Sequence, residues 1–109
     1  MTRKAEVEAA LALTQQTLGA VDALVNNAGI FRAADFLDVT EADWDAVIAV
    51  NLKGSFLVGQ AVARAMTTND DGQGGQGYGA IVNMSSVNSV MAIPSIASYN
   101  ASKGGINQL

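Results

Sequence analysis

A tyrosine and a lysine near the end of the chain have the spacing that proton-transfer chemistry needs. Tyr99 and Lys103 lie four residues apart in an expected helix, so their side chains should project from one face with Cβ atoms about 5–6 Å apart. A nearby ammonium favours the phenolate form of a tyrosine. Ser86, after a short apolar strand, offers a hydroxyl that could hold a carbonyl oxygen while the tyrosine exchanges a proton with it. The same residues could instead be an ordinary surface Tyr-Lys pair and a serine that begins a loop. The rest of the chain must decide between a catalytic and a purely structural role for them.

Composition excludes several classes of function. The 109-residue chain has a net charge of −4 and no basic run, which argues against nucleic acid or an anionic membrane as the partner. It contains neither cysteine nor histidine, so disulfides, thiolate nucleophiles, Ser-His-Asp triads and the usual zinc sites are excluded, and we expect no metal. The N-terminus lacks the apolar core of a signal peptide, and polar residues interrupt the longest apolar stretch (46–66). We therefore expect a cytoplasmic protein without a membrane span.

Five elements must position these residues, in the order helix, strand, helix, strand, helix. The expected helices cover residues near 3–18, 41–66 and 95–109, and the expected strands cover 21–26 and 80–85. The first strand is mostly apolar, which predicts burial on both faces. The alternation predicts an α/β fold, a partial doubly wound parallel sheet of Rossmann-like type with right-handed crossovers and helices on both faces.

A sheet of two strands is too small to be stable by itself. Isolated strand pairs are marginal, and parallel sheets need cover on both faces. The chain also begins on one expected helix and ends inside another. We therefore expect residues 1–109 to be one segment of a larger doubly wound domain.

The long helix has polar residues at its centre. Asn51 and Gly54 fall there, and an asparagine competes for backbone hydrogen bonds, which predicts a kink or an inserted water. The helix is apolar on more than one side, which predicts a sheet against one side and favours another subunit against the other. In the loop at 30–39 we expect large apolar side chains to be tucked inward: Phe31, Phe36 and Leu37.

Two glycine-containing loops differ in what they can bind. Asn26-Asn-Ala-Gly29 follows a strand, where carboxamides can satisfy loop backbone and a glycine lets a ligand approach, although a plain turn explains the same residues. Within 67–79, Gly72, Gly74 and Gly77 have the spacing G-x-G-x-x-G. A dinucleotide-binding turn follows a strand and opens a helix, whereas this loop follows a helix and precedes a strand. We interpret it as a flexible surface connection.

Taken in order, these motifs resemble the short-chain dehydrogenase/reductase family. The resemblance rests on Asn26-Asn-Ala-Gly29, on Asn51 in Val-Asn-Leu-Lys-Gly, on Ser86 and on Tyr99-x-x-x-Lys103, and it covers essentially the whole chain. It implies that residues 1–109 are the central segment of a single NAD(P)-binding Rossmann-like domain. The implied activity is hydride transfer between a nicotinamide cofactor, NAD or NADP, and a small-molecule alcohol or carbonyl substrate.

The resemblance also implies a role for each matching residue. Tyr99 is expected to be the general acid/base, and Lys103 to favour its phenolate and to hydrogen-bond the nicotinamide ribose. Ser86 is expected to orient the substrate oxygen, and Asn51 to hold the kink and a water that relays protons to the lysine. The residues expected to contact the cofactor are Asn27, Ala28, Gly29, Tyr99 and Lys103. Asn26 is expected to brace the sheet instead.

The segment departs from the family in what it does not contain. The glycine-rich phosphate turn, the residue that selects NAD or NADP and the substrate-covering loop all lie outside it. Two hypotheses therefore stay open: the parent is an NAD(P)-dependent alcohol dehydrogenase or carbonyl reductase, or the chain is a catalytically inactive remnant or interaction module. By similarity, we expect a full-length homodimer or homotetramer. The residues expected near the substrate mouth are Asn88, Met91, Ile93 and Pro94, and the substrate stays undetermined.

Overall fold

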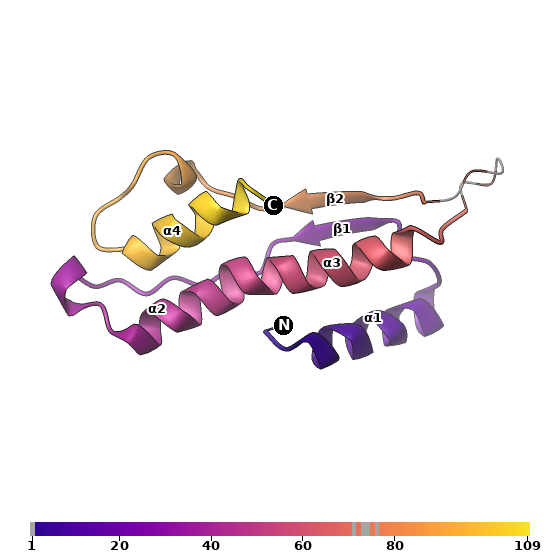
Figure 1. Ribbon diagram of the computed structural model, residues 1–109, viewed down its shortest axis with the longest axis horizontal. Coiled ribbons are helices and arrows are strands. Elements are labelled where there is room, and N and C mark those ends of the chain that lie inside the picture. The colour runs from indigo at the N-terminus through magenta and orange to yellow at the C-terminus, as the bar shows by residue number, and fades with distance from the viewer. Residues whose placement is uncertain (1, 71, 73–74, 76) are drawn as a thin grey trace.

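The computed structural model describes residues 2–70, 72, 75 and 77–109, and within them helices and strands alternate in the expected order (Figure 1). The helices are α1 (Lys4–Leu18), α2 (Glu41–Ile48), α3 (Gly54–Met66) and α4 (Ala97–Ile106), and the strands are β1 (Ala23–Asn26) and β2 (Ala80–Asn83). A π turn, η2 (Ala49–Lys53), joins α2 to α3, and short 3-10 turns occur at η1 (Phe36–Asp38) and η3 (Val87–Ser89). The expected α/β class is confirmed, and both strands are shorter than predicted.

The two strands are parallel and meet in register, from Ala23 opposite Ala80 to Asn26 opposite Asn83. Parallel neighbours need a crossover, which α2, η2 and α3 provide as one continuous helical rod. Both strands end on the same edge of the sheet, and α2 and α4 lie beyond that edge (Figure 1). The polar residues that follow each strand are therefore brought together at the carboxyl ends of the strands.

Only one face of the sheet is covered in this chain. Val25 and Val82 are register partners on one face and are 60% and 54% exposed. The side chains of Leu24 and Asn26 point to the opposite face, toward α3, and are half-buried and buried. The prediction that the first strand is buried on both faces is therefore wrong for this segment, because the described residues leave the valine face open to solvent.

The small core lies on the α3 side of the sheet. Val7 of α1 and Val62 of α3 are buried where these two helices pack together, and Met66 at the end of α3 is buried beside Gly79. A second buried pair, Val47 and Ile106, belongs to α2 and α4, which also contact each other. The helices therefore provide nearly all of the apolar burial, and the strands contribute their polar ends to the site.

The rod from Glu41 to Met66 is long and apolar enough to cross a membrane by length and composition alone. Here it is a helix of the folded domain, because α3 packs on both strands and on α1, and α2 packs on α4. The buried Asn51 near its middle is satisfied by protein groups. The sequence predicts a kink or an inserted water at Asn51, and the structure has a π turn there, a single-turn bulge that commonly occurs at functional sites.

The loop between β1 and α2 is less buried than its sequence predicts. Phe31, Phe36 and Leu37 are 61%, 78% and 94% exposed, so the inward packing expected for them is wrong. Phe36 and Leu37 fall in η1, a single 3-10 turn without a buried residue. Hydrophobicity alone does not decide burial where a segment has nothing to pack against.

The glycine-containing connection before β2 lies partly outside the described residues, including Gly74. Its described part is attached to the sheet by Asn69, whose Nδ2 donates to the carbonyl oxygens of Val21 at 2.8 Å and Tyr78 at 3.0 Å. The connection follows α3 and precedes β2, at the opposite end of the strands from the polar cluster (Figure 1). The glycine spacing is therefore not part of the site.

Candidate active site

Asn51 connects three parts of the chain at the centre of the site. It lies in the π turn and is 1% exposed. Its Oδ1 accepts from the N–H of Ile30 at 2.8 Å, and its Nδ2 donates to the carbonyl oxygen of Ile30 at 2.9 Å and to Ser102 Oγ at 3.0 Å. One side chain thus fixes the loop after β1 and the helix α4 to the middle of the long rod.

Asn26 braces the ends of the strands, as predicted. Its Nδ2 donates to Asn83 Oδ1 on the paired strand at 2.9 Å and to the carbonyl oxygen of Ser55 on α3 at 3.1 Å. These two bonds tie the sheet to α3 at the point where both strands end. Asn27, Ala28 and Gly29 follow directly and are exposed, so their backbone is accessible at the carboxyl end of β1.

Tyr99 and Lys103 are neighbours on α4, as their spacing predicts. The Lys103 Nζ lies 5.7 Å from the centroid of the Tyr99 ring and donates to the carbonyl oxygen of Met84 at 2.6 Å. Lys103 is 5% exposed, and among the described residues no carboxylate pairs with it. A lysine is rarely this buried unless it is paired. Within the described part of the chain, the partners of the buried Lys103 ammonium are a carbonyl oxygen and an aromatic ring.

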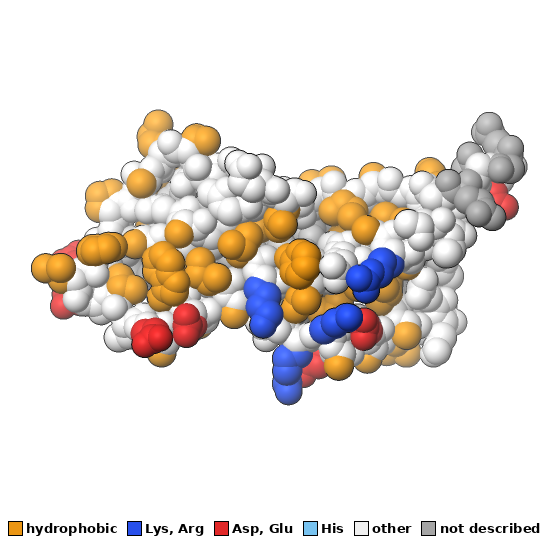
Figure 2. All heavy atoms as spheres, in the orientation of Figure 1, with side chains coloured by type: hydrophobic (Ala, Val, Ile, Leu, Met, Phe, Trp, Pro, Cys, Tyr) orange, Lys and Arg blue, Asp and Glu red, His pale blue; other side chains and the backbone are white. Residues whose placement is uncertain are grey.

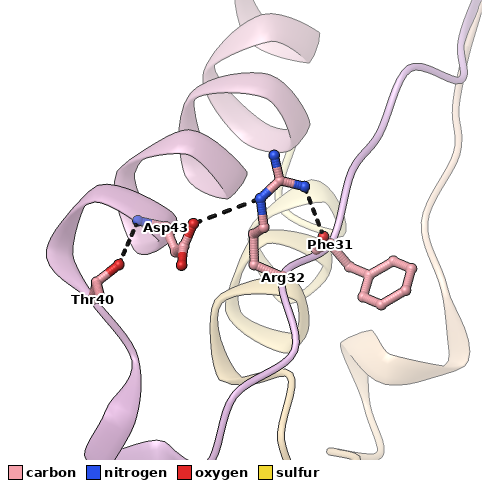
Figure 3. Close-up of polar contacts among 4 residues, drawn as sticks. All are labelled: Phe31, Arg32, Thr40 and Asp43. Atoms are coloured by element: carbon pink, nitrogen blue, oxygen red, sulfur yellow. Dashed lines mark hydrogen bonds and ion pairs between the residues drawn. The ribbon is translucent and has the colours of Figure 1, made fainter.

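The ring of Tyr99 also meets Phe31 from the loop after β1. Their ring centroids are 6.5 Å apart in an edge-to-face arrangement. Arg32 anchors this loop, because it donates to the carbonyl oxygen of Phe31 at 3.3 Å and its Nε lies 3.6 Å from Asp43 (Figure 3). Thr40 caps α2 by accepting from the N–H of Asp43 at 3.1 Å. The first turn of α2 and the Tyr99 ring thus border the same loop.

Ser86 lies just beyond β2 and is held by its own turn. Its Oγ donates to Asn88 Oδ1 at 3.1 Å and accepts from the N–H of Asn88 at 3.2 Å. It caps η3, which packs against α4. The helix that carries Tyr99 and Lys103 therefore lies against the turn that carries Ser86.

The residues expected near a substrate divide into two groups. Met91, Ile93 and Pro94 are exposed in the loop between η3 and α4. Asn88 is 8% exposed and donates through Nδ2 to Asn100 Oδ1 at 2.9 Å. Asn88 is thus a buried residue that connects η3 to α4, whereas the other three residues are accessible to solvent in the loop.

Two contributors were missed by the sequence analysis. Ser102 is fully buried, accepts from Asn51 and donates to the carbonyl oxygen of Tyr99 at 2.8 Å. Asn100 bonds to Asn88 and, at 2.8 Å, to the carbonyl oxygen of Ile93. For Ser102 a signal existed, because residues 99–103 span more than one helical turn and cannot all face solvent. Among the described residues, no group of three or more His, Cys, Asp or Glu side chains could hold a metal ion.

The parallel strands with an α-helical crossover define a partial α/β domain of the doubly wound type, and Lys103 and Tyr99 lie at the carboxyl ends of its strands. The family model described as short chain dehydrogenase matches residues 1–109. The chain therefore belongs to the short-chain dehydrogenase family.

Relatives of known name agree with this assignment. The chain is 41% identical over 99 residues to gluconate 5-dehydrogenase of Gluconobacter oxydans, covering 91% of this chain and 36% of that protein. It is 38% identical over 109 residues to 5-keto-D-gluconate 5-reductase of Escherichia coli, covering 100% of this chain and 40% of that protein. These relatives are dehydrogenases and reductases of small molecules, so the chain derives from an oxidoreductase family.

Solved structures give the same fold. A gluconate 5-dehydrogenase from Burkholderia cenocepacia, crystallised with NADP and tartrate, superposes with a TM-score of 0.87 at 43% identity, covering 98% of this chain and 39% of that one. The chain thus spans about two fifths of the length of the relatives it matches. The open valine face of the sheet is consistent with this partial coverage.

Proposed function

We propose that this chain is the central segment of an NAD(P)-dependent alcohol dehydrogenase or carbonyl reductase. The observation that carries the proposal is the buried Lys103, which lies 5.7 Å from the Tyr99 ring centre and has no carboxylate partner among the described residues. A phenol held at the carboxyl ends of the strands can exchange a proton with a substrate oxygen, and alcohol oxidation and carbonyl reduction both require such an exchange. Family membership and the names of the relatives support the same reaction class.

The mechanism assigns one task to each residue. In reduction, the Tyr99 hydroxyl donates its proton to the substrate carbonyl oxygen, and in oxidation the Tyr99 phenolate accepts the alcohol proton. Ser86 holds the substrate oxygen by a hydrogen bond, and Lys103 places its ammonium beside the Tyr99 ring. Asn51 positions α4 through Ser102 and the loop after β1 through Ile30. We further propose that Asn51 holds a water that relays protons to Lys103.

Two observations fit a nicotinamide cofactor. The Lys103 ammonium has three N–H donors and bonds to one carbonyl oxygen, so donors remain for ribose hydroxyls. The exposed backbone of Asn27, Ala28 and Gly29 lies at the carboxyl end of a parallel strand, where α/β sheets bind ligands. When bound, NAD or NADP supplies or receives the hydride. A crystal structure of the Burkholderia relative contains NADP, which supports NADP as one of the two choices.

The proposal is tested by removing one oxygen atom. In the full-length protein, Tyr99→Phe should abolish NAD(P)H-dependent turnover while cofactor binding, followed by nicotinamide fluorescence, is retained. Tyr78→Phe is the matched control, because Tyr78 is the other tyrosine and lies before β2, away from the site. Turnover that survives Tyr99→Phe would refute the assignment.

The second candidate is a catalytically inactive remnant or interaction module. It is favoured by the open valine face of the sheet and by coverage of only about two fifths of each relative. NAD(P)H-dependent activity of the isolated 109-residue chain would exclude it. The nucleotide sequence on both sides of the coding region separates the two hypotheses directly, because a continuous frame supplies the missing strands and stop codons do not.

We also propose that the full-length protein is a cytoplasmic homodimer or homotetramer that associates through its long helices. Apolar side chains run along the rod on the face in view in Figure 2, and the exposed apolar residues of α2 and α3 include Trp44 and Phe56. Large apolar residues on an exposed helix typically mark an interface. Sedimentation of the full-length protein as a monomer at micromolar concentration would contradict this assembly.

A further inference from the structure

One face of α4 holds the turn that follows β2. Asn100, Lys103 and Asn107 recur at spacings of three and four residues, so they lie along one side of the helix. Asn107 accepts from Ser85 Oγ at 2.5 Å and donates to Ser89 Oγ at 2.8 Å. Asn100, two turns earlier, holds the other end of the same segment. The turn that carries Ser86 is therefore attached to α4 on both sides of Ser86.

The bonds of Asn100 have a defined direction. The carbonyl oxygen of Ile93 can only accept, so Asn100 must present its Nδ2, which donates at 2.8 Å. The Oδ1 of Asn100 then faces Asn88 and accepts from its Nδ2 at 2.9 Å. The Oδ1 of Asn88 is left facing Ser86, whose hydroxyl donates to it at 3.1 Å. The carbonyl oxygen of Ile93 thus sets the orientation of the Asn100 carboxamide. Through it, the same oxygen sets the orientation of the Asn88 carboxamide and of the Ser86 hydroxyl.

We propose that Asn100 is a positioning residue that sets the direction of the Ser86 hydroxyl proton through Asn88. This inference rests on the proposed function, in which Ser86 holds the substrate oxygen. The Ser86 oxygen accepts from the N–H of Asn88 at 3.2 Å, so one lone pair remains for a substrate. With its proton directed at Asn88, Ser86 can offer a substrate only this lone pair. A carbonyl oxygen accepts only, so its binding requires the Ser86 proton to leave Asn88.

Burial keeps this arrangement intact. Asn88 is 8% exposed, and every buried side-chain nitrogen or oxygen of the described chain has a partner. Reversing the Asn88 amide would place its Nδ2 against Ser86 and its Oδ1 against the Oδ1 of Asn100. Two acceptors would then face each other, which is costly away from water. Asn88 Oδ1 consequently faces Ser86 for as long as Asn100 is in place, and without a substrate it is the acceptor for the Ser86 proton.

Three variants distinguish a change in the direction of the Ser86 hydroxyl proton from a general loss of protein stability. Asn100→Leu removes the acceptor that orients Asn88 and also both hydrogen bonds with the Ile93 backbone. Asn100→Asp loses the donor to Ile93 and keeps an acceptor for the Asn88 Nδ2. Asn107→Leu is the matched control, because it removes two bonds between the same helix and the same turn without touching Asn88.

The readout is neutron diffraction from deuterium-exchanged crystals of the full-length protein. We expect one Ser86 deuteron position, directed at Asn88 Oδ1, in the wild type, Asn100→Asp and Asn107→Leu. In Asn100→Leu this single position should be lost, because Asn88 is free to turn. A wild-type Ser86 deuteron directed elsewhere overturns the proposal without any variant, and so does a single unchanged position in Asn100→Leu. The measurement needs no substrate, so this inference and the oxidoreductase assignment fail separately.

Discussion

Replacing Asn51 by leucine should show how much of the site depends on one carboxamide. The substitution keeps the side-chain size and removes the three hydrogen bonds to Ile30 and Ser102. At about 1 kcal/mol for each bond, the loss is about 3 kcal/mol of unfolding free energy. The loss of unfolding free energy should be large for a single substitution, because Asn51 is 1% exposed and the Ser102 hydroxyl that loses its partner has little access to water.

The assay is urea denaturation of the full-length protein, followed by circular dichroism. If the unfolding free energy falls by about 2 kcal/mol per M of urea, Asn51→Leu should lower the urea concentration at the unfolding midpoint by about 1.5 M. Lys53→Gln is the control, because Lys53 lies exposed in the same π turn and exposed substitutions usually change stability by less than about 0.5 kcal/mol. A midpoint shift for Asn51→Leu no larger than that of Lys53→Gln would refute the view that this residue holds the loop and α4 together.

Adjacent glycines of α4 should respond differently to alanine. Gly105→Ala would place a Cβ 2.7 Å from Leu52, so we expect a loss of about 1 kcal/mol that Leu52→Ala relieves. Gly104→Ala meets nothing closer than 3.8 Å and should stabilise the helix by about 0.5–1 kcal/mol; equal thermal midpoints for the two variants would contradict the close approach of α4 to the π turn. Thr40→Ala removes the N-cap bond of α2 and should cost about 1 kcal/mol in denaturant titrations. Arg32→Ala breaks an exposed ion pair and should cost less than about 1 kcal/mol, so a larger loss than that of Thr40→Ala would be unexpected.

The sequence predicts the order of elements and the bracing role of Asn26 well. Helical and strand periodicity depend on nearby residues, so α1, the long rod and α4 could be located from spacing alone. Asn51 stood out because an asparagine in an apolar helix needs a partner, and the π turn supplies the geometry in which it meets Ile30 and Ser102. A residue whose type does not suit its expected helix, as Asn51 does not, was therefore the most informative sequence signal for the site.

Burial was predicted less well, because it depends on what packs from elsewhere. Val25 and Phe36 have the hydrophobicity of core residues, yet both are exposed. The strand pattern assumes a sheet with helices on both faces, and this chain covers about two fifths of its relatives. The same limit applies to η1, where a 3-10 turn presents Leu37 to solvent. Sequence pattern predicts which side an apolar residue belongs to, and only the complete domain determines whether that side is covered.

The carboxamides of α4 show why part of the site was hidden in the sequence. On an isolated helix, Asn100 and Asn107 are indistinguishable from solvent-facing residues, because their partners lie in the turn after β2. Lys103 shares their face and donates to Met84 at 2.6 Å, so the lysine is fixed by the strand end as well as by the helix. The position of its charge beside Tyr99 therefore depends on the attachment of α4 to β2. It follows that substitutions along this face should disturb proton transfer even where they touch neither Tyr99 nor a substrate.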